Sequence, residues 1–373
     1  MLPKVGIIYL TYPTPQWERD IDRCFRSFEK ITYPKDRVEL ICVESKGKLS
    51  PVRPWFHERW LSRSGTSLPR ITYIFHDEWI GFAGNNNLGL MEAKRLGCEY
   101  VYLLNEDTDV DPGFLEKVVD RAEKDARIGI VQSLLCLGEE RDRLNSCGNA
   151  WQILGLGFSR GYHWSVEEYE RWLRAERVTN PDLEIAYASG AGMLARVSAL
   201  DACGGLFDEA FFMYHEDTDA SLRMRIQGWK VVLEPTSVVY HYYEFAKAKI
   251  NYYWMERNRY ALVFMYYHWT TLLLLAPLFA VFDLATWGFA VLRGWADMKW
   301  KVLKDLCSPS FWRWIWKRRQ EIQTRRTVSE RAFLRLSVPE ILFQEPSVKN
   351  PLLEKVGNPL MRAYWAIVWR ILP

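Results

Sequence analysis

Two acidic segments carry side chains of the kind that bind a metal ion or move a proton. The segment LLNEDTDVDP places Asp107 and Asp109 after an apolar run, and carboxylates at this spacing supply the oxygen ligands that Mg²⁺ prefers. The segment FDEAFFMYHEDTD places Glu216 and Asp217 before an amphipathic stretch, where one carboxylate is suited to act as a general base. Acidic residues also cap helices and favour helix N-termini, so these residues by themselves leave a structural role open.

Two further segments hold polar residues beside expected strands. In GFAGNNNLGLMEA, Gly84, Asn85 and Asn86 enter a helix; glycine lets the backbone approach a phosphate, and a helix N-terminus favours anions. A tight turn with an Asn cap explains the same residues equally well. In VVYHYYE, His241 ends a strand, and a lone His is more often structural although it is a capable metal ligand.

The elements expected to position these side chains are βαβ units. In the first 130 residues, short β-branched runs alternate with amphipathic stretches, which predicts a Rossmann-like, mostly parallel central sheet flanked by helices. We expect strands at 5–10, 38–43, 71–75 and 100–104, and helices near 17–30, 86–96 and 114–126. Ligands bind beyond the carboxyl ends of such strands. The polar residues at these ends are Thr11, Tyr12, Glu44, Asp77 and the cluster 105–109.

The remainder of the chain divides into two parts by pattern. A Gly- and aromatic-rich insertion at about 138–181 precedes a second block, which closes with a strand pair at 230–233 and 237–240. We predict one globular unit over 1–245, which divides at about residue 130 into a first half, 1–130, and a second half, 131–245. Residues 246–373 are predicted to form a helical C-terminal region.

The C-terminal region is rich in tryptophan and basic residues. Residues 260–282 contain no Asp, Glu, Lys or Arg, which is long enough to cross a bilayer. Residues 293–335 hold twelve Lys or Arg against four Asp or Glu, and basic residues at both ends of the apolar stretch disfavour a span. We therefore prefer in-plane or re-entrant attachment to an anionic membrane surface, with a span and a buried helix pair as alternatives. The basic segment contains no base-reading motif, so no nucleic-acid partner is expected.

The seven cysteines show no CxxC pair and predict reduced thiols in the cytoplasm. The first residues run directly into an expected strand, and we expect no signal peptide.

Taken together and in this order, the segments resemble the inverting family-2 glycosyltransferases of the GT-A fold, in particular their rhamnosyltransferase-like branch. GFAGNNNLGL is similar to that family's GFAGGNNxGL, and LLNEDTDVDPGFL is similar to its LLNPDTxVxPGFL. FDEAFFMYHEDTDASLRMRIQGW is similar to its FDExFFxYxEDxDxxxRxxxxGW. The resemblance covers residues 5–260 and continues more weakly through RNRYALVF and RRQEIQTRRTVSERAFLRL.

The resemblance implies a metal-dependent sugar transfer from a nucleotide diphosphate sugar to a hydroxyl of a glycan or lipid-linked acceptor, with rhamnose a candidate sugar. It makes residues 1–245 the catalytic domain, with the nucleotide-sugar half at about 1–130 and the acceptor half at about 131–245. It places the enzyme on the cytoplasmic face of the cell membrane, as a peripheral or monotopic protein. Mg²⁺ or Mn²⁺ is expected on Asp109 directly, with His241 a further contact and Asp107 on ribose or a metal-bound water. Asp217, beside Glu216, is expected to be the catalytic base.

Two groups of donor contacts follow from the resemblance. The nucleoside is expected to lie against Thr11, Tyr12, Glu44 and Asp77, and the donor diphosphate and sugar against Gly84, Asn85, Asn86 and Arg257. The chain departs from the family at Glu44, where Asp is usual, and after His241, where Tyr242, Tyr243 and Glu244 replace a Gly- and Ser-rich tail.

Two other functions compete with this interpretation. A sugar-phosphate nucleotidyltransferase needs a Gly-rich, Arg- or Lys-bearing loop after the first strand, and this chain has TYPTPQW there. An inactive GT-A-like binding protein is disfavoured by the presence of Asp107, Asp109 and Asp217.

Overall fold

The computed structural model describes residues 2–372 except 13–14, 47–51, 243–248 and 343–350. The chain divides into two compact units. The first comprises Met1–Asn149, Ser159–Met224 and Trp229–Tyr243, and the second comprises Ala150–Phe158, Arg225–Gly228 and Glu244–Pro373. The sequence did not suggest that the two short internal segments accompany the C-terminal part. The boundary at residue 245, and the division of the catalytic domain into halves, stay predictions.

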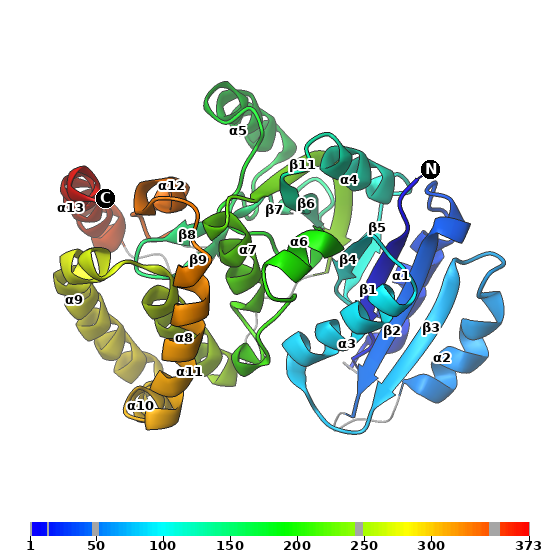
Figure 1. Ribbon diagram of the computed structural model, residues 1–373, viewed down its shortest axis with the longest axis horizontal. Coiled ribbons are helices and arrows are strands. Elements are labelled where there is room, and N and C mark those ends of the chain that lie inside the picture. Colours follow the sequence, from blue (N-terminus) through cyan, green and yellow to red (C-terminus); the bar gives the residue numbers. More distant parts are fainter. Residues whose placement is uncertain (1, 13–14, 47–51, 243–248, 343–350, 373) are drawn as a thin grey trace. The chain divides into compact units, whose positions relative to one another are not determined.

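The first unit is built on a nine-stranded sheet (Figure 1). Its path is β3-β2-β1-β4-β10-β6-β11-β5, and β7 pairs with β6. The strands are β1 (Val5–Leu10), β2 (Val38–Ser45), β3 (Arg70–His76), β4 (Tyr100–Leu104), β5 (Thr108–Val110), β6 (Ile128–Leu137), β7 (Leu144–Ser146), β10 (Gly192–Arg196) and β11 (Lys230–His241).

The sheet is mixed, and the four strands from the N-terminal part of the chain form a parallel block at one end of it. β3, β2, β1 and β4 are parallel neighbours, while β10 runs antiparallel to β4 and to β6. The expected strand pair near residue 235 is one long strand, β11, whose register with β6 shifts between Glu234 and Val238. A β-bulge lets a strand continue where its alternation of apolar and polar residues is interrupted. In the sequence, such an interruption looks the same as a turn between two strands.

Helices cover both faces of this sheet. Successive β1 residues point to opposite faces, so Ile7 and Tyr9 join one core and Ile8 and Leu10 join the other. The first core takes residues from α1 (Trp17–Phe28), α2 (Arg53–Arg59) and α4 (Phe114–Glu123). The second takes residues from α3 (Gly81–Arg95), α5 (Val166–Thr179), α6 (Val197–Ala202) and α7 (Glu216–Ile226). Six cysteines are buried and one is exposed. All seven are free thiols, which agrees with the reduced cysteines predicted from the sequence.

Helix α3 begins five residues earlier than expected, at Gly81. Gly81 has φ +71°, and a Cβ there would lie 2.7 Å from the carbonyl oxygen and ring of Phe212. Only glycine fits both constraints without strain. The GFAGNNN segment is therefore the first turns of the helix itself.

The second unit is mainly helical. Its helices are α8 (Lys249–Tyr266), α9 (Trp269–Arg293), α10 (Ala296–Leu306), α11 (Pro309–Thr324), α12 (Glu330–Leu334) and α13 (Asn358–Ile371), preceded by a π-helical turn at Leu353–Gly357. A small sheet joins β12 (Ser337–Val338), β8 (Asn149–Gln152) and β9 (Gly157–Ser159). Among the described residues, α9 alone is long and apolar enough to cross a membrane by length and composition.

Candidate active site

The carboxyl ends of β1, β2, β3 and β4 meet at one edge of the sheet, as their parallel order requires. At the end of β2, the Glu44 carboxylate accepts hydrogen bonds from the backbone N–H of Val52 at 2.7 Å and of Arg53 at 3.2 Å, where α2 begins. It also accepts one from the Tyr73 hydroxyl at 2.7 Å, and that hydroxyl lies 3.2 Å from the Thr11 hydroxyl. The buried Glu44 side chain therefore holds α2 and Tyr73 in place.

Aromatic side chains line the same edge beyond β1 and β3. The ring of Tyr12 contacts the half-exposed Trp79 edge-on, with 4.7 Å between ring centroids. Burial, followed by the nearby Glu106, raises the pKa of the Tyr12 hydroxyl. Asp77, which follows β3, is exposed.

Asp107 and His241 face each other where β4 and β11 end. The His241 Nε2 lies 3.1 Å from Asp107 Oδ1, and its Nδ1 lies 3.0 Å from Asn145 Oδ1. An Nδ1–H that donates to Asn145 directs Nε2 toward the carboxylate. Burial by itself would raise the pKa of Asp107, but the interaction with His241 is sufficient to leave that pKa below its ordinary value.

Asp109 points to a different set of partners. Its Oδ2 accepts a hydrogen bond from Arg141 Nη2 at 2.7 Å and one from the Tyr242 hydroxyl at 3.1 Å. The Arg23 guanidinium lies over the Tyr242 ring, 3.2 Å from its centroid. The sequence predicted Asp109 next to the metal; the structure places its carboxylate on Arg141 and Tyr242.

A short turn links Asp217 to the end of β4. Asp217 Oδ2 accepts a hydrogen bond from the Gly190 N–H at 3.1 Å, and the neighbouring Ala191 carbonyl accepts one from the Asn105 N–H at 3.4 Å. The next residue, Gly192, pairs with Leu104 in the sheet. Residues distant in sequence, in α7 and after β4, are therefore brought to one edge of the same unit.

The acidic pair at the start of α7 has raised pKa values. Burial is the main cause for both carboxyls; for Glu216 the adjacent Asp217 adds to it, while backbone N–H groups partly offset it for Asp217. Phe212, Tyr214 and His215, just before the pair, have φ of 62°, 63° and 70°. Positive φ costs non-glycine residues energy, and such conformations concentrate at functional sites.

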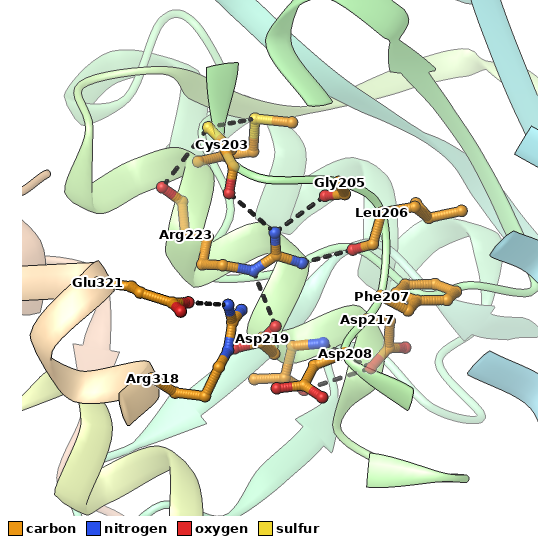
Figure 2. A network of polar contacts seen from close by, with 12 residues as sticks. Cys203, Gly205, Leu206, Phe207, Asp208, Asp217, Asp219, Arg223, Arg318 and Glu321 are labelled. Carbon is orange, nitrogen blue, oxygen red and sulfur yellow. Dashed lines mark hydrogen bonds and ion pairs between the residues drawn. The ribbon is translucent and has the colours of Figure 1, made fainter. Parts of the chain in front are cut away.

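Arg223 fixes the opposite side of α7 (Figure 2). Its Nε donates to Asp219 Oδ2 at 2.8 Å, and both side chains are almost fully buried. The same guanidinium donates to the carbonyl oxygens of the segment that precedes the FDEAFF turn: Cys203 at 3.0 Å, Gly205 at 2.9 Å, and Leu206.

The polar side chains at the start of α3 form hydrogen bonds within the first unit. Asn85 Nδ2 donates to the Ser45 hydroxyl at the end of β2, at 3.0 Å, and Asn86 Nδ2 donates to the Phe82 carbonyl, also at 3.0 Å. A Cβ at Gly84 would lie 2.9 Å from the Ile80 side chain. Arg257 belongs to the second unit, where it lies 3.2 Å from Asp305.

Three participants in this arrangement were not foreseen from the sequence. Asn145 and Arg141 lie in the loosely patterned insertion, and no local signal distinguishes them from other polar loop residues. Gly190 stands in YASGAG, where consecutive small residues are typical of a turn but do not indicate its partner. Each acquires its role through a contact distant in sequence.

The comparisons with known proteins agree with this architecture. The family model described as glycosyltransferase like family 2 matches residues 8–261. A solved mannosyltransferase from Pyrobaculum calidifontis, in complex with GDP-Man and Mn²⁺, superposes with a TM-score of 0.51 and 15% identity, covering 87% of this chain and 86% of that one. The fold is thus that of the GT-A glycosyltransferases.

Two curated relatives are similar over shorter stretches. An N-acetylglucosaminyl-diphospho-decaprenol L-rhamnosyltransferase of Mycobacterium tuberculosis is 29% identical over 150 residues, which is 39% of this chain and 47% of the relative. Glucomannan 4-beta-mannosyltransferase 7 of Arabidopsis thaliana is 25% identical over 202 residues, 54% of this chain and 33% of the relative. The chain thus matches less than half the length of these relatives. Because the family model covers more than half of the chain, the protein belongs to glycosyltransferase family 2.

Proposed function

We propose that this protein transfers a sugar from a nucleotide diphosphate sugar to an acceptor hydroxyl, with inversion at the anomeric carbon. The observation that carries the proposal is the link from Asp217 through Gly190 and Ala191 to Asn105, two residues before Asp107. It brings a candidate base to the edge of the sheet where the candidate metal ligands lie. Family membership supports the same reaction class.

The residues at the end of β4 fit a divalent cation. Asp107 offers a carboxylate and His241 an imidazole nitrogen already oriented by Asn145, which are suitable ligands for Mn²⁺ or Mg²⁺. No group of three His, Cys, Asp or Glu side chains with ligand geometry occurs among the described residues. That suits a cation that takes its other ligands from substrate phosphates and water. When bound, the cation supplies positive charge that neutralises the leaving diphosphate.

We assign the direct metal contacts to Asp107 and His241. Asp109 is proposed to act beside them, holding Arg141 and Tyr242. A carboxylate already shared by a guanidinium and a phenol is less available to a cation than one that faces a single imidazole.

Asp217 is proposed as the base that takes the acceptor's proton while the hydroxyl attacks the sugar carbon. Burial raises the pKa of its carboxyl, which makes the ionised form a stronger proton acceptor. Displacement on the face opposite the leaving group inverts the anomeric centre. Glu216 is proposed to contribute through its proximity to Asp217.

The nucleoside is proposed to lie along the edge formed by Thr11, Tyr12 and Asp77, where Tyr12 and Trp79 offer aromatic surface. Glu44 is proposed to shape this edge through α2 and Tyr73, because its oxygens are engaged there. The start of α3, at Gly84, Asn85 and Asn86, is proposed to face the donor diphosphate and sugar. Arg257 belongs to the second unit, and its contact with the donor stays a prediction from the sequence.

The sugar and acceptor are proposed from the relatives' names alone. The mycobacterial relative is named for L-rhamnose transfer to a decaprenol-linked acceptor, and the other proteins are named for mannose transfer. We propose rhamnose and a lipid-linked or cell-envelope glycan acceptor, at the cytoplasmic face of the membrane. Family membership disfavours the competing nucleotidyltransferase, and the assembled acidic residues disfavour an inactive binding protein.

The test is the variant Asp217→Asn, assayed with a panel of nucleotide diphosphate sugars and Mn²⁺. We expect turnover to fall by at least about a hundredfold, because an amide accepts no proton at this step, while donor binding in a thermal-shift assay stays unchanged. Asp201→Asn is the matched control, since Asp201 is an exposed carboxylate on α6 paired with Lys94. Undiminished turnover in Asp217→Asn would remove that residue from the base role.

A further inference from the structure

The helix α9 carries an apolar face that no described residue covers. Only 11% of its most apolar window is buried. Its exposed side chains between Trp269 and Leu292 include no charged residue, and several large ones are among the most exposed of the chain: Leu273 at 74%, Val281 at 65%, Leu284 at 74% and Leu292 at 85%. A patch of this kind marks an interaction surface.

The polar groups near the middle of α9, Asp283 and Thr286, contact other helices of the unit instead. Asp283 Oδ1 lies 2.9 Å from Arg259 Nη2 of α8, and the Thr286 hydroxyl accepts a hydrogen bond from Lys299 of α10 at 2.8 Å. Arg259 and Lys299 both pair with Glu256 of α8. The helix is therefore fixed along its inner side by ionic contacts near its middle, while its outer side is apolar.

The C-terminal helix α13 contacts α9 and carries exposed apolar side chains of its own. The Tyr364 hydroxyl of α13 donates a hydrogen bond to the Leu274 carbonyl of α9 at 2.5 Å. The exposed residues Leu360, Ile367 and Ile371 follow one another at helical spacing along α13. We call this surface, formed by the exposed apolar side chains of α9 and α13, the α9–α13 face.

The exposed charges of the second unit are nearly all positive. Over its described C-terminal part, exposed Lys and Arg number eleven, against two exposed acidic residues, Asp297 and Glu354. Other basic residues, such as Arg319, Arg326 and Lys299, form contacts inside the unit. The excess of positive charge at the surface therefore comes from different residues. The exposed cations are Arg293, Lys301, Lys304, Arg313, Lys317, Arg325, Arg331, Arg335, Lys355, Arg362 and Arg370.

We propose that the α9–α13 face lies embedded in one leaflet of an anionic lipid bilayer, parallel to its plane, with exposed Lys and Arg of the same unit on the headgroups. An apolar face on a unit whose exposed charges are nearly all cationic fits the interface of such a membrane. A second copy of the chain is a poorer occupant, because pairing two such units would bring their cations together. This inference goes beyond the proposed reaction. It is tested by binding to vesicles and not by sugar transfer, so either proposal can fail without the other.

The ionic contacts of α9 also disfavour a crossing helix. If α9 crossed the bilayer, Asp283 would lie near its midplane together with Arg259, Glu256 and Lys299, or would lose its partner there. Charged groups at that depth are costly. A helix lying in the interface keeps these groups on its inner side.

Flotation of the purified chain with preformed vesicles tests the surface. We expect binding to vesicles of phosphatidylcholine with phosphatidylglycerol, weaker binding to phosphatidylcholine alone, and loss of binding as salt rises. The triple variant Val281→Gln, Leu284→Gln, Leu292→Gln should bind at least about tenfold more weakly. The matched control is Met91→Gln with Val178→Gln, apolar side chains of the first unit that are 67% and 81% exposed, which should bind as the parent does.

Three results would overturn the proposal. The first is absence of vesicle binding by the parent chain. The second is equal loss in the triple variant and the control. The third is a dimer, detected by light scattering, that the triple variant no longer forms, together with no vesicle binding in flotation. That result would mean that a second copy of the chain covers the α9–α13 face. Unchanged circular dichroism and thermal melting of the triple variant, expected for exposed positions, exclude misfolding as the cause of lost binding.

A labelling experiment distinguishes one leaflet from a span. The two labelling positions are Cys307, exposed after α10, and a cysteine introduced by Thr270→Cys in a Cys307→Ser background. Thr270 is the second residue of α9 and Cys307 follows the helix in sequence, so a crossing α9 would place them on opposite sides of the bilayer. With protein added outside sealed vesicles, an impermeant maleimide should label both positions before detergent is added. Protection of one position until detergent opens the vesicles would show a span and overturn the proposed geometry.

Discussion

At the scale of single residues, the two aspartates of the DTD segment have different environments. Asp107 faces His241, whose other ring nitrogen is held by Asn145, and Asp109 is shared by Arg141 and Tyr242. Both belong to the same short segment and have the same chemistry. The difference arises because Asp109 lies within β5, where it pairs with Tyr240 of β11, and Asp107 lies before it.

This difference predicts unequal effects on metal binding. Asp107→Asn should weaken Mn²⁺ binding by at least about tenfold, since a carboxylate ligand is lost. Asp109→Asn should leave Mn²⁺ affinity nearly unchanged and lower thermal stability, because Arg141 and Tyr242 lose an ionised partner. Electron paramagnetic resonance of Mn²⁺ titrated with protein and a nucleoside diphosphate measures the first, and melting measures the second. The opposite order of affinities would return the direct metal role to Asp109.

At the scale of elements, α7 is positioned from both sides of its axis. Its first turn presents Asp217 to Gly190, and Arg223, almost two turns later, ties it to the carbonyls of Cys203 and Gly205 (Figure 2). The turn that precedes α7 contains three non-glycine residues with positive φ, Phe212, Tyr214 and His215. An element held at both ends stabilises a strained connection that an isolated segment would relax.

Removing the buried guanidinium should destabilise this element strongly. Arg223→Met leaves Asp219 and backbone carbonyls without their cationic partner in a dry environment, and we expect a loss of about 3–5 kcal/mol in the free energy of unfolding. Arg171→Met on α5, where the arginine is exposed, is the control and should change it by less than about 0.5 kcal/mol. Urea denaturation followed by circular dichroism gives both values. Equal small losses would mean that Arg223 does not hold α7.

At the scale of the whole molecule, the two units are stabilised by different means. The first has apolar cores on both faces of its sheet. The second encloses a charged cluster, in which Glu256 pairs with Arg259 at 2.8 Å and with Lys299. Burial would raise the pKa of Glu256, but its two cationic partners hold that pKa at about 2. The C-terminal carbonyls of α8 are bonded by Arg319, Gln323 and Arg326 of the following helices and connections.

The charged cluster predicts an acid-sensitive contribution to stability. The pKa of Glu256 is lower in the folded than in the unfolded chain, so its stabilisation is complete above about pH 4.5 and is lost as pH falls toward about 2. Glu256→Gln should therefore be less stable than the parent at pH 6, and the difference should narrow by roughly 3 kcal/mol at most on acidification. Denaturant titrations of both proteins across this range measure the gap. A gap that stays constant would show that the pKa of Glu256 is the same in the folded and unfolded chains, so that its cationic partners do not stabilise the ionised form.

The sequence by itself determined the parallel strands, the edge at which their polar ends meet, and the family. Alternation and chain direction fix these features locally: β1 and β4 begin and end where their patterns predicted, and parallel strands must end together. The C-terminal helices also followed from composition.

Only the tertiary structure decided which side chains meet at that edge and which helix faces are covered. Asp107 meets His241 because β5 and β11 pair in a particular register, and Glu44 turns to α2 because that helix begins beside it. The apolar pattern of α9 left its orientation open, and the ion pair with Arg259 set which side faces outward. Such contacts join residues distant along the chain, and their energies depend on distances that spacing in sequence does not contain.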